Sequence, residues 1–386
     1  MRERQAAMTG LQRFFLKTEI VFGPRMFDRL EAFRGQRIGI ITDAFMVKSG
    51  MVDRVRAKLP PCEIEVFGEV LPEPPLQNIA KGARFLADFK PDAILALGGG
   101  SAIDAAKAIL ATLREMEPSR SIVMIAVPTT SGTGSEVTSY AVISEPERGI
   151  KHPLRSEEII PDIALLDPDL VLSVPPKVTA DTGMDVITHA LEAYVALEAN
   201  DFSDAFAEKA LALAFTHLPT AFANGNDGVA RGALHNASCM AGMAFNASGL
   251  GINHGLAHAI GGRLHIPHGK INAMLLPLVI EYNAGTRGAF GPCLPAATRY
   301  ADLARRLGLE GPSVRAGVKS LAQAVSRLNA QFGIPPTLRA LGADLDEVAR
   351  HGAAMVQGTL ADSCTASNPR KPTPDDVAEL IGAVTG

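Results

Sequence analysis

The first half of the chain alternates short apolar runs with segments whose apolar residues recur at helical spacing. The apolar runs predict five strands, at residues 37–42, 63–70, 93–97, 122–127 and 163–166. Helical spacing occurs between them, at residues 48–59, 76–89 and 102–113. Strands that alternate with helices in this way predict a parallel sheet with helices on both faces.

The pattern changes after Val174, where Pro175 and Pro176 interrupt the chain. Nearly every later segment is alanine-rich and helical in its spacing. These segments lie at residues 179–196, 203–217, 229–245, 270–282, 297–307, 313–332 and 374–384. We therefore expect an α/β domain at 14–174 and an all-helical domain at 175–386. Residues 1–13 are polar and weakly patterned, and form either a frayed terminus or a short amphipathic docking segment.

Composition narrows the classes of function. The 386 residues are 47% hydrophobic and 20% charged with a net charge of −4, which is typical of a globular protein with two ordinary domains. No Lys/Arg run stands out, so binding of nucleic acid is not expected. The apolar runs are too short to cross a bilayer, and the N-terminus lacks the apolar region of a secretory signal. Four scattered cysteines without a CxxC pair indicate reduced thiols and a cytoplasmic protein.

A glycine-rich turn follows the third predicted strand and opens a helix. It contains Gly98, Gly99, Gly100 and Ser101, with Asp104 in the next helical turn. Glycines let the backbone approach a pyrophosphate, and the helix N-terminus stabilises its charge. The spacing is neither GxGxxG nor that of a P-loop, so a tight turn without a ligand is the alternative.

A second loop, at residues 128–136, leaves the next strand with five hydroxyl side chains and two glycines. Two such loops at the carboxyl ends of neighbouring strands are typical of a dinucleotide crevice. Asp43 ends the first predicted strand, where it could accept hydrogen bonds from the adenosine ribose and repel a 2′-phosphate. A turn or helix-capping aspartate is the alternative there.

Candidate metal ligands lie in the helical half. Asp185 and His189 are four residues apart, which places them on one face of a helix. The segment 254–268 adds His254 and His268, and also His258 and His265. One carboxylate and three imidazoles suit iron(II) or zinc, although a core or surface role for any single histidine is the alternative.

Taken together, these motifs resemble the iron-containing (group III) alcohol dehydrogenases, from about Phe14 to the C-terminus. The matching segments are GGGSAIDAAK, PTTSGTGSE, TGMDVITHALEAYV, GLGINHGLAHAIGG and IPHGKINA. Within that family, GIKHPL (149–154) and SCTASNPRKPT (363–373) look most like 1-propanol and ethanol dehydrogenases of bacterial microcompartments. The resemblance implies the dehydroquinate synthase-like fold, a Rossmann-like domain followed by a helical metal-binding domain.

The resemblance also implies a role for each matching residue. Asp185, His189, His254 and His268 would bind iron, or alternatively zinc, and His258 would lie near the substrate as a proton relay. The remaining matches would bind NAD. Pyrophosphate would contact Gly99, Gly100, Ser101 and Asp104, beside Gly98; the nicotinamide side would contact Thr129, Thr130, Thr133 and Lys151.

The activity that follows is reversible hydride transfer between NAD(H) and a short-chain alcohol or aldehyde. A polyol or lactaldehyde dehydrogenase of the same family is one alternative. A lyase of the dehydroquinate synthase type and a scaffold with a structural metal are the others. The resemblance further implies a homodimer or higher oligomer, with docking to an aldehyde dehydrogenase or to a microcompartment shell.

Overall fold

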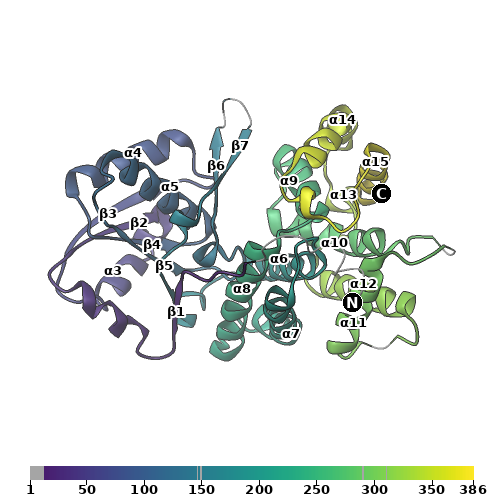
Figure 1. Ribbon diagram of the computed structural model, residues 1–386, viewed down its shortest axis with the longest axis horizontal. Helices are drawn as coiled ribbons and strands as arrows, with labels where there is room; N and C mark the ends of the chain where they lie inside the picture. The colour runs from purple at the N-terminus through teal and green to yellow at the C-terminus, as the bar shows by residue number, and fades with distance from the viewer. Residues whose placement is uncertain (1–12, 146, 148–149, 289–290, 310) are drawn as a thin grey trace.

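The computed structural model describes residues 13–145, 147, 150–288, 291–309 and 311–386 (Figure 1). The expected N-terminal extension therefore lies almost entirely outside the described residues. In Figure 1 a sheet-containing half, in purple to teal, stands beside a helical half, in green to yellow. The change from sheet to helices falls between η4 (Pro168–Leu170) and α6 (Pro176–Val195).

The sheet has six parallel strands in the order β1-β8-β5-β4-β2-β3. The strands are β1 (Glu19–Phe22), β2 (Arg37–Asp43), β3 (Glu63–Val70), β4 (Ala93–Gly98), β5 (Val123–Pro128) and β8 (Ile163–Leu166). The five expected strands are confirmed to within two residues. β4 and β5 are buried almost throughout, as strands covered on both faces must be.

Helices cover both faces of the sheet, as expected. One face carries α4 (Leu76–Phe89) and α5 (Gly100–Met116), whose apolar side chains form one core with the sheet. The other face carries η1 (Met26–Phe33), α2 (Ala44–Lys48) and α3 (Met51–Arg56), which form a second core. The helix expected at 48–59 is confirmed only in part, because α3 covers residues 51–56 and Gly50, with φ +75°, separates it from α2.

An antiparallel hairpin that the apolar pattern does not predict follows β5. It consists of β6 (Tyr140–Glu145) and β7 (Ile150–Arg155). The hairpin projects from the sheet domain toward the upper edge in Figure 1. Its first strand meets the segment before α4 through the pair Pro75 and Ser144.

The helical half is built around α6, which is buried along most of its length. The other long helices are α7 (Asp201–Ala223), α8 (Gly228–Ser248), α9 (Ile252–Leu264), α10 (His268–Ala284), α11 (Pro295–Arg306), α12 (Val314–Gln331), α14 (Leu345–Ala361) and α15 (Pro374–Thr385). One large core joins them. The expected fold class, a parallel α/β domain followed by a helical domain, is confirmed. Three described helices of this half have no counterpart among the expected segments: α9, the short α13 (Leu338–Leu341) and α14.

Two close approaches at glycines join the halves. A Cβ on Gly134, in the loop after β5, would lie 2.7 Å from the Cα of Gly242 in α8. A Cβ on Gly132 would lie 2.8 Å from the Cβ of Thr182 in α6. Glycine at these positions therefore lets the loop after β5 rest directly on the two helices. This contact brings the hydroxyl-rich loop to the helix that carries Asp185 and His189.

Candidate metal centre and dinucleotide site

Three helices bring the four expected metal ligands together. Asp185 and His189 lie on consecutive turns of α6, His254 lies in the first turn of α9, and His268 begins α10. An oxygen of Asp185 lies 3.7 Å from Nε2 of His254 and 3.7 Å from Nε2 of His268. The other carboxylate oxygen lies 4.0 Å from Nε2 of His189.

These separations fit a bound divalent ion. Two atoms that each bind one ion at about 2.0–2.2 Å lie no more than about 4.4 Å apart. The donor atoms of Asp185, His189 and His254 lie within 4.8 Å of one another, and all three side chains are buried. Burial lowers the pKa of His189 and of His254. At His189 the negative charge of Asp185 opposes this shift but does not cancel it. Both rings are therefore neutral at pH 7, the form that binds a metal ion.

Asn272 is a site residue that the sequence analysis missed. Its Nδ2 lies 2.8 Å from an Asp185 oxygen, 3.1 Å from Nε2 of His268 and 3.3 Å from Nε2 of His254. It lies one helical turn after His268 on α10, so the i+4 spacing was the available signal. The amide nitrogen marks the point on which three of the four ligands converge.

Glu192 is a second missed residue, one turn beyond His189 on α6. It is buried, and its carboxylate pairs with Nδ1 of His254 and accepts a 2.7 Å hydrogen bond from the backbone N–H of Asn253. Burial raises the pKa of Glu192 to about 8, and hydrogen bonds from the backbone at Asn253 and His254 oppose the rise. Histidines that bind metals are commonly oriented by such a partner on the second ring nitrogen.

His258 lies beside the metal ligands. Its Nδ1 is 2.8 Å from an oxygen of Asp362, and its ring stacks on that of His268 with centroids 5.2 Å apart. Burial would raise the pKa of Asp362, but the hydrogen bond and charge of His258 outweigh burial and hold that pKa low. Asp362, which comes from the turn after α14, was missed because it is 104 residues away in sequence.

The glycine-rich turn adopts a conformation suited to close approach. Gly98 has φ +152°, and a Cβ there would lie 2.6 Å from the Cβ of Ala102. Gly99 precedes the first residue of α5, so the turn presents a helix N-terminus. A Cβ on Gly100 would lie 2.8 Å from the side chain of Thr133. The two loops expected to hold the dinucleotide are therefore in contact.

The hydroxyl residues of the two loops differ in exposure. Thr129 is buried, and its backbone N–H donates to the carbonyl of Gly98. Thr130 lies partly exposed beside Gly99, and Thr133 is exposed. Ser101 accepts a hydrogen bond of 3.3 Å from the backbone N–H of Glu73.

Asp104 faces the protein interior. One oxygen accepts a 2.7 Å hydrogen bond from Ser135, and the other accepts a 3.0 Å hydrogen bond from the backbone N–H of Val142. A carboxylate would also repel a pyrophosphate. The contacts therefore favour a positioning role for Asp104, holding the second loop and β6 against α5.

Asp43 combines both roles considered for it. One oxygen caps α2 by accepting hydrogen bonds from the backbone N–H groups of Phe45 and Met46, at 2.8 and 3.0 Å. The other lies 3.7 Å from the position that a Cβ on Gly98 would occupy. The carboxylate thus lies directly beside the glycine-rich turn. The backbone of Lys151 lies in β7, but its side chain is outside the described part of the structure.

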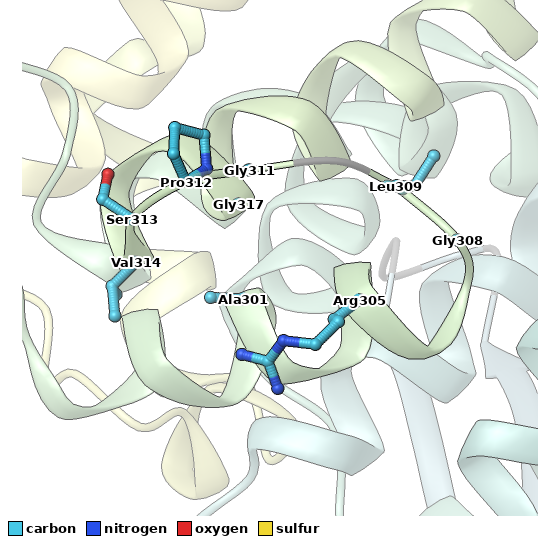
Figure 2. Close-up of a pocket in the computed structure, with 9 residues that line it drawn as sticks. All are labelled: Ala301, Arg305, Gly308, Leu309, Gly311, Pro312, Ser313, Val314 and Gly317. Atoms are coloured by element: carbon cyan, nitrogen blue, oxygen red, sulfur yellow. The ribbon is translucent and has the colours of Figure 1, made fainter.

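A separate cavity of about 850 Å³ lies between α11 and α12 (Figure 2). Its walls include Ala301, Arg305, Leu309 and Ser313. Among the described residues that line it, there is no metal-binding cluster and none of the residues expected to bind NAD. Volume alone therefore does not make it the functional site. Among the described helices, none is both long enough and apolar enough to cross a membrane.

Comparisons with known proteins agree with the expected family. The iron-containing alcohol dehydrogenase model matches residues 17–168, and the C-terminal model of the Fe-containing alcohol dehydrogenase family matches residues 179–385. The 1-propanol dehydrogenase PduQ of Salmonella typhimurium is 43% identical, with 96% of this chain and 99% of that protein covered. The NADPH-dependent butanol dehydrogenase of Clostridium saccharobutylicum is 36% identical, with 97% of this chain and 98% of that protein covered.

A solved structure leads to the same family. The crystal structure of a 1,3-propanediol oxidoreductase superposes with a TM-score of 0.87 at 31% identity, over 97% of this chain and 99% of that one. Both family models, near-complete coverage and the grouped ligands agree with the resemblance first seen in the motifs. The chain belongs to the iron-containing alcohol dehydrogenase family.

Proposed function

We propose that this enzyme interconverts a short-chain primary alcohol and its aldehyde with NAD(H), at a divalent ion held by Asp185, His189, His254 and His268. The observation that carries the proposal is the convergence of these four side chains beside the two loops of the dinucleotide domain. The first relative described above is a 1-propanol dehydrogenase, which supports propanal or acetaldehyde as the substrate class.

The chain's own residues orient the reactants. When bound, the divalent ion would polarise the substrate oxygen, and NAD(H) would accept or donate the hydride. Glu192 fixes the orientation of His254. His258 directs Nδ1 toward Asp362, so its Nε2, on the opposite edge of the ring, is the nitrogen placed to relay the alcohol proton.

The dinucleotide would lie along the glycine-rich turn and the second loop. The backbone of Gly98, Gly99 and Gly100 and the N-terminus of α5 suit a pyrophosphate. Asp43 beside the turn favours the free ribose of NADH over the 2′-phosphate of NADPH. The family alone does not dictate this preference, because one relative is named as NADPH-dependent.

A small, unbranched substrate of two to four carbons fits the surroundings of the ligands. The ring of Phe245 stacks on that of His189 with centroids 4.6 Å apart. Small apolar residues, among them Ala241 and Gly242, precede it on α8. Extra hydroxyls of a polyol would lose hydrogen bonds here, at about 1–3 kcal/mol for each unpaired group.

The test combines anaerobic metal analysis with NADH oxidation on an aldehyde panel. We expect one tightly bound ion per chain and a higher kcat/KM for propanal or acetaldehyde than for glycerol-derived substrates or lactaldehyde. Asp185→Ala should lose ion and activity together while remaining folded. Stoichiometric metal with near-normal turnover in that variant would refute the ligand set, and preference for lactaldehyde would refute the substrate.

We also propose that the enzyme forms a homodimer or higher oligomer and works in the cytoplasm within a bacterial microcompartment, next to an aldehyde dehydrogenase. The likeness to PduQ supports this setting. Light scattering would test the oligomer. Co-purification with shell proteins or an aldehyde dehydrogenase would test the location, and a monomer recovered free of both would contradict it.

A further inference from the structure

A second group of metal-binding side chains lies beside the first and shares none of its ligands. His258, Asp362 and Cys364 each offer one donor atom, and the three atoms lie within 4.8 Å of one another. His258 comes from α9, whereas the other two come from the turn between α14 and η5 (Thr365–Ser367). We propose that this trio is a second divalent-cation site that favours zinc and similar thiophilic ions.

The donor set distinguishes this site from the catalytic centre. The first group offers only carboxylate and imidazole donors, whereas the second adds the thiol of Cys364. Thiolate, imidazole and carboxylate together are typical zinc ligands, and three protein ligands leave one tetrahedral position for water. The thiol therefore gives the second group a ligand that zinc accepts readily, whereas the first group, which suits iron(II) or zinc, contains none.

The geometry requires only a small adjustment. Nδ1 of His258 and an oxygen of Asp362 are 2.8 Å apart. Tetrahedral bonds of about 2.1 Å place two ligand atoms about 3.4 Å apart, so the ion would widen this pair by roughly 0.6 Å. All three residues are partly exposed, which leaves room for that movement and for entry of the ion. On binding, the thiol proton leaves to solvent, and the proton on Nδ1 of His258 is replaced by one on Nε2, so the imidazole stays neutral.

The turn that supplies two of the ligands is held in place. The backbone N–H of Cys364 donates to Asp362 at 2.8 Å, which fixes these two residues relative to each other. A few residues on, Asn368 accepts a 3.1 Å hydrogen bond from the backbone N–H of Ile252, at the start of α9. The turn is thereby fastened to the helix that carries His258, so the three donors are ordered before any ion arrives.

Occupation of this site would inhibit the dehydrogenase, a consequence that rests on the proposed role of His258. A neutral imidazole carries one N–H. An ion on Nδ1 places that hydrogen on Nε2, which then cannot accept the alcohol proton. Zinc at the second site would therefore block the proton relay without displacing the catalytic metal.

Cobalt(II) titration of the metal-free enzyme tests the site independently of activity. Only a cobalt–thiolate bond gives sulfur-to-cobalt charge-transfer absorption, and the first group contains no thiol. We expect two bound ions in the wild type, with the charge-transfer band developing only with the second. Cys364→Ser should lose the band and bind the second ion at least tenfold more weakly, while Cys293→Ser, at an exposed thiol, should match the wild type.

Asp362→Asn provides a second variant that keeps the shape of the side chain. It should also weaken binding of the second cobalt ion and leave the first unchanged. A wild type that binds a single ion, or a band that persists in Cys364→Ser, would overturn the proposal. Two-step binding in a protein without dehydrogenase activity would instead refute the proposed function and leave the second site standing.

Zinc inhibition tests the consequence. Zinc added to enzyme whose first site is already loaded should inhibit propanal reduction, and Cys364→Ser should require at least tenfold more zinc for the same inhibition. Equal inhibition of both proteins would mean that zinc acts by replacing the catalytic metal. That outcome would overturn the inhibitory role of the second site.

Discussion

The contact between Glu192 and His254 decides which ring nitrogen of this histidine faces the other proposed metal ligands. With Nδ1 turned toward the carboxylate, Nε2 lies 3.7 Å from Asp185. Glu192→Gln keeps the size of the side chain but replaces one carboxyl oxygen with an amide NH2 group, which cannot accept a hydrogen bond. Loss of such a partner typically lowers metal affinity about 10–100-fold.

We therefore expect Glu192→Gln to bind its metal about 10–100-fold more weakly than the wild type. A correspondingly lower concentration of free chelator should then remove the metal from the variant. Competition with a coloured chelator measures this directly, without reference to turnover. Glu198→Gln, in the exposed loop after α6, serves as the matched control. Unchanged metal affinity in Glu192→Gln would show that the pairing is structural only.

Asp43 carries a separate prediction, because its two oxygens have different neighbours. Asp43→Ser removes the charge beside Gly98 but can still cap α2, whereas Asp43→Ala removes both functions. We expect both variants to gain kcat/KM for NADPH by at least tenfold. Only Asp43→Ala should also lose stability, by about 0.5–2 kcal/mol.

Steady-state kinetics with both cofactors and urea unfolding measure the two effects of Asp43. If neither variant changes the NADPH to NADH ratio, Asp43 does not contact the ribose. If Asp43→Ser loses as much stability as Asp43→Ala, the cap is not the source of the loss.

At the scale of elements, α5 links the glycine-rich turn to the second loop. Lys107, two turns into α5, donates to the backbone carbonyls of Thr138 and Tyr140, at 2.8 and 2.7 Å. Lys107 and nearby Glu136 are both buried. Burial lowers the pKa of Lys107 to about 8 and raises the pKa of Glu136 to about 7.

This buried cluster predicts a pH effect on stability. The folded-state pKa of Glu136 lies above the ordinary glutamate value of 4.5 because the side chain is buried, so the folded protein binds the proton more tightly. The contribution of Glu136 to the free energy of unfolding is therefore fully present below pH 4.5 and is lost as the pH rises to about 7. Over this window the free energy of unfolding falls by at most about 1.4 kcal/mol per pH unit.

Glu136→Gln should remove that slope, since glutamine does not titrate. Relative to the wild type, the free energy of unfolding of the variant should rise between pH 4.5 and about 7, the window set by Glu136. Denaturant unfolding at several pH values measures this difference. A constant difference across the window would mean that Glu136 is not desolvated in the folded protein.

The elements also show what the sequence could and could not predict. Buried strands such as β4 and β5 were found because both faces are apolar. The four-residue edge strand β1 has few buried positions, and β6 lacks a long apolar run, so neither gave a pattern. The candidate metal ligands, which the structure brings together, were suggested by i,i+4 spacing and the family motifs. Asp362 and the inward-facing Asp104 depend on distant contacts that no local pattern contains.

For the whole molecule, the close approach of Gly134 to Gly242 controls how the loop after β5 sits against α8 and the neighbouring α6, which carries two of the proposed metal ligands. A Cβ on Gly242 would lie 2.8 Å from Val137 and 2.9 Å from the carbonyl oxygen of Gly134. Gly242→Ala must therefore push the loop away from α8, at a cost typical of overpacking, about 1–3 kcal/mol. Each half keeps its own core, because the change lies only at the contact between them.

We expect Gly242→Ala to bind metal normally but to lose at least tenfold in kcat, since a displacement of about 1 Å between reacting groups can cost about 100-fold. Gly228→Ala is the matched control, because it lies on the same helix with open space around the added methyl group. Metal analysis, cofactor affinity and single-turnover hydride transfer separate the effects. Normal transfer in Gly242→Ala would show that the halves tolerate a shift at this contact, and that the catalytic geometry is set within each half.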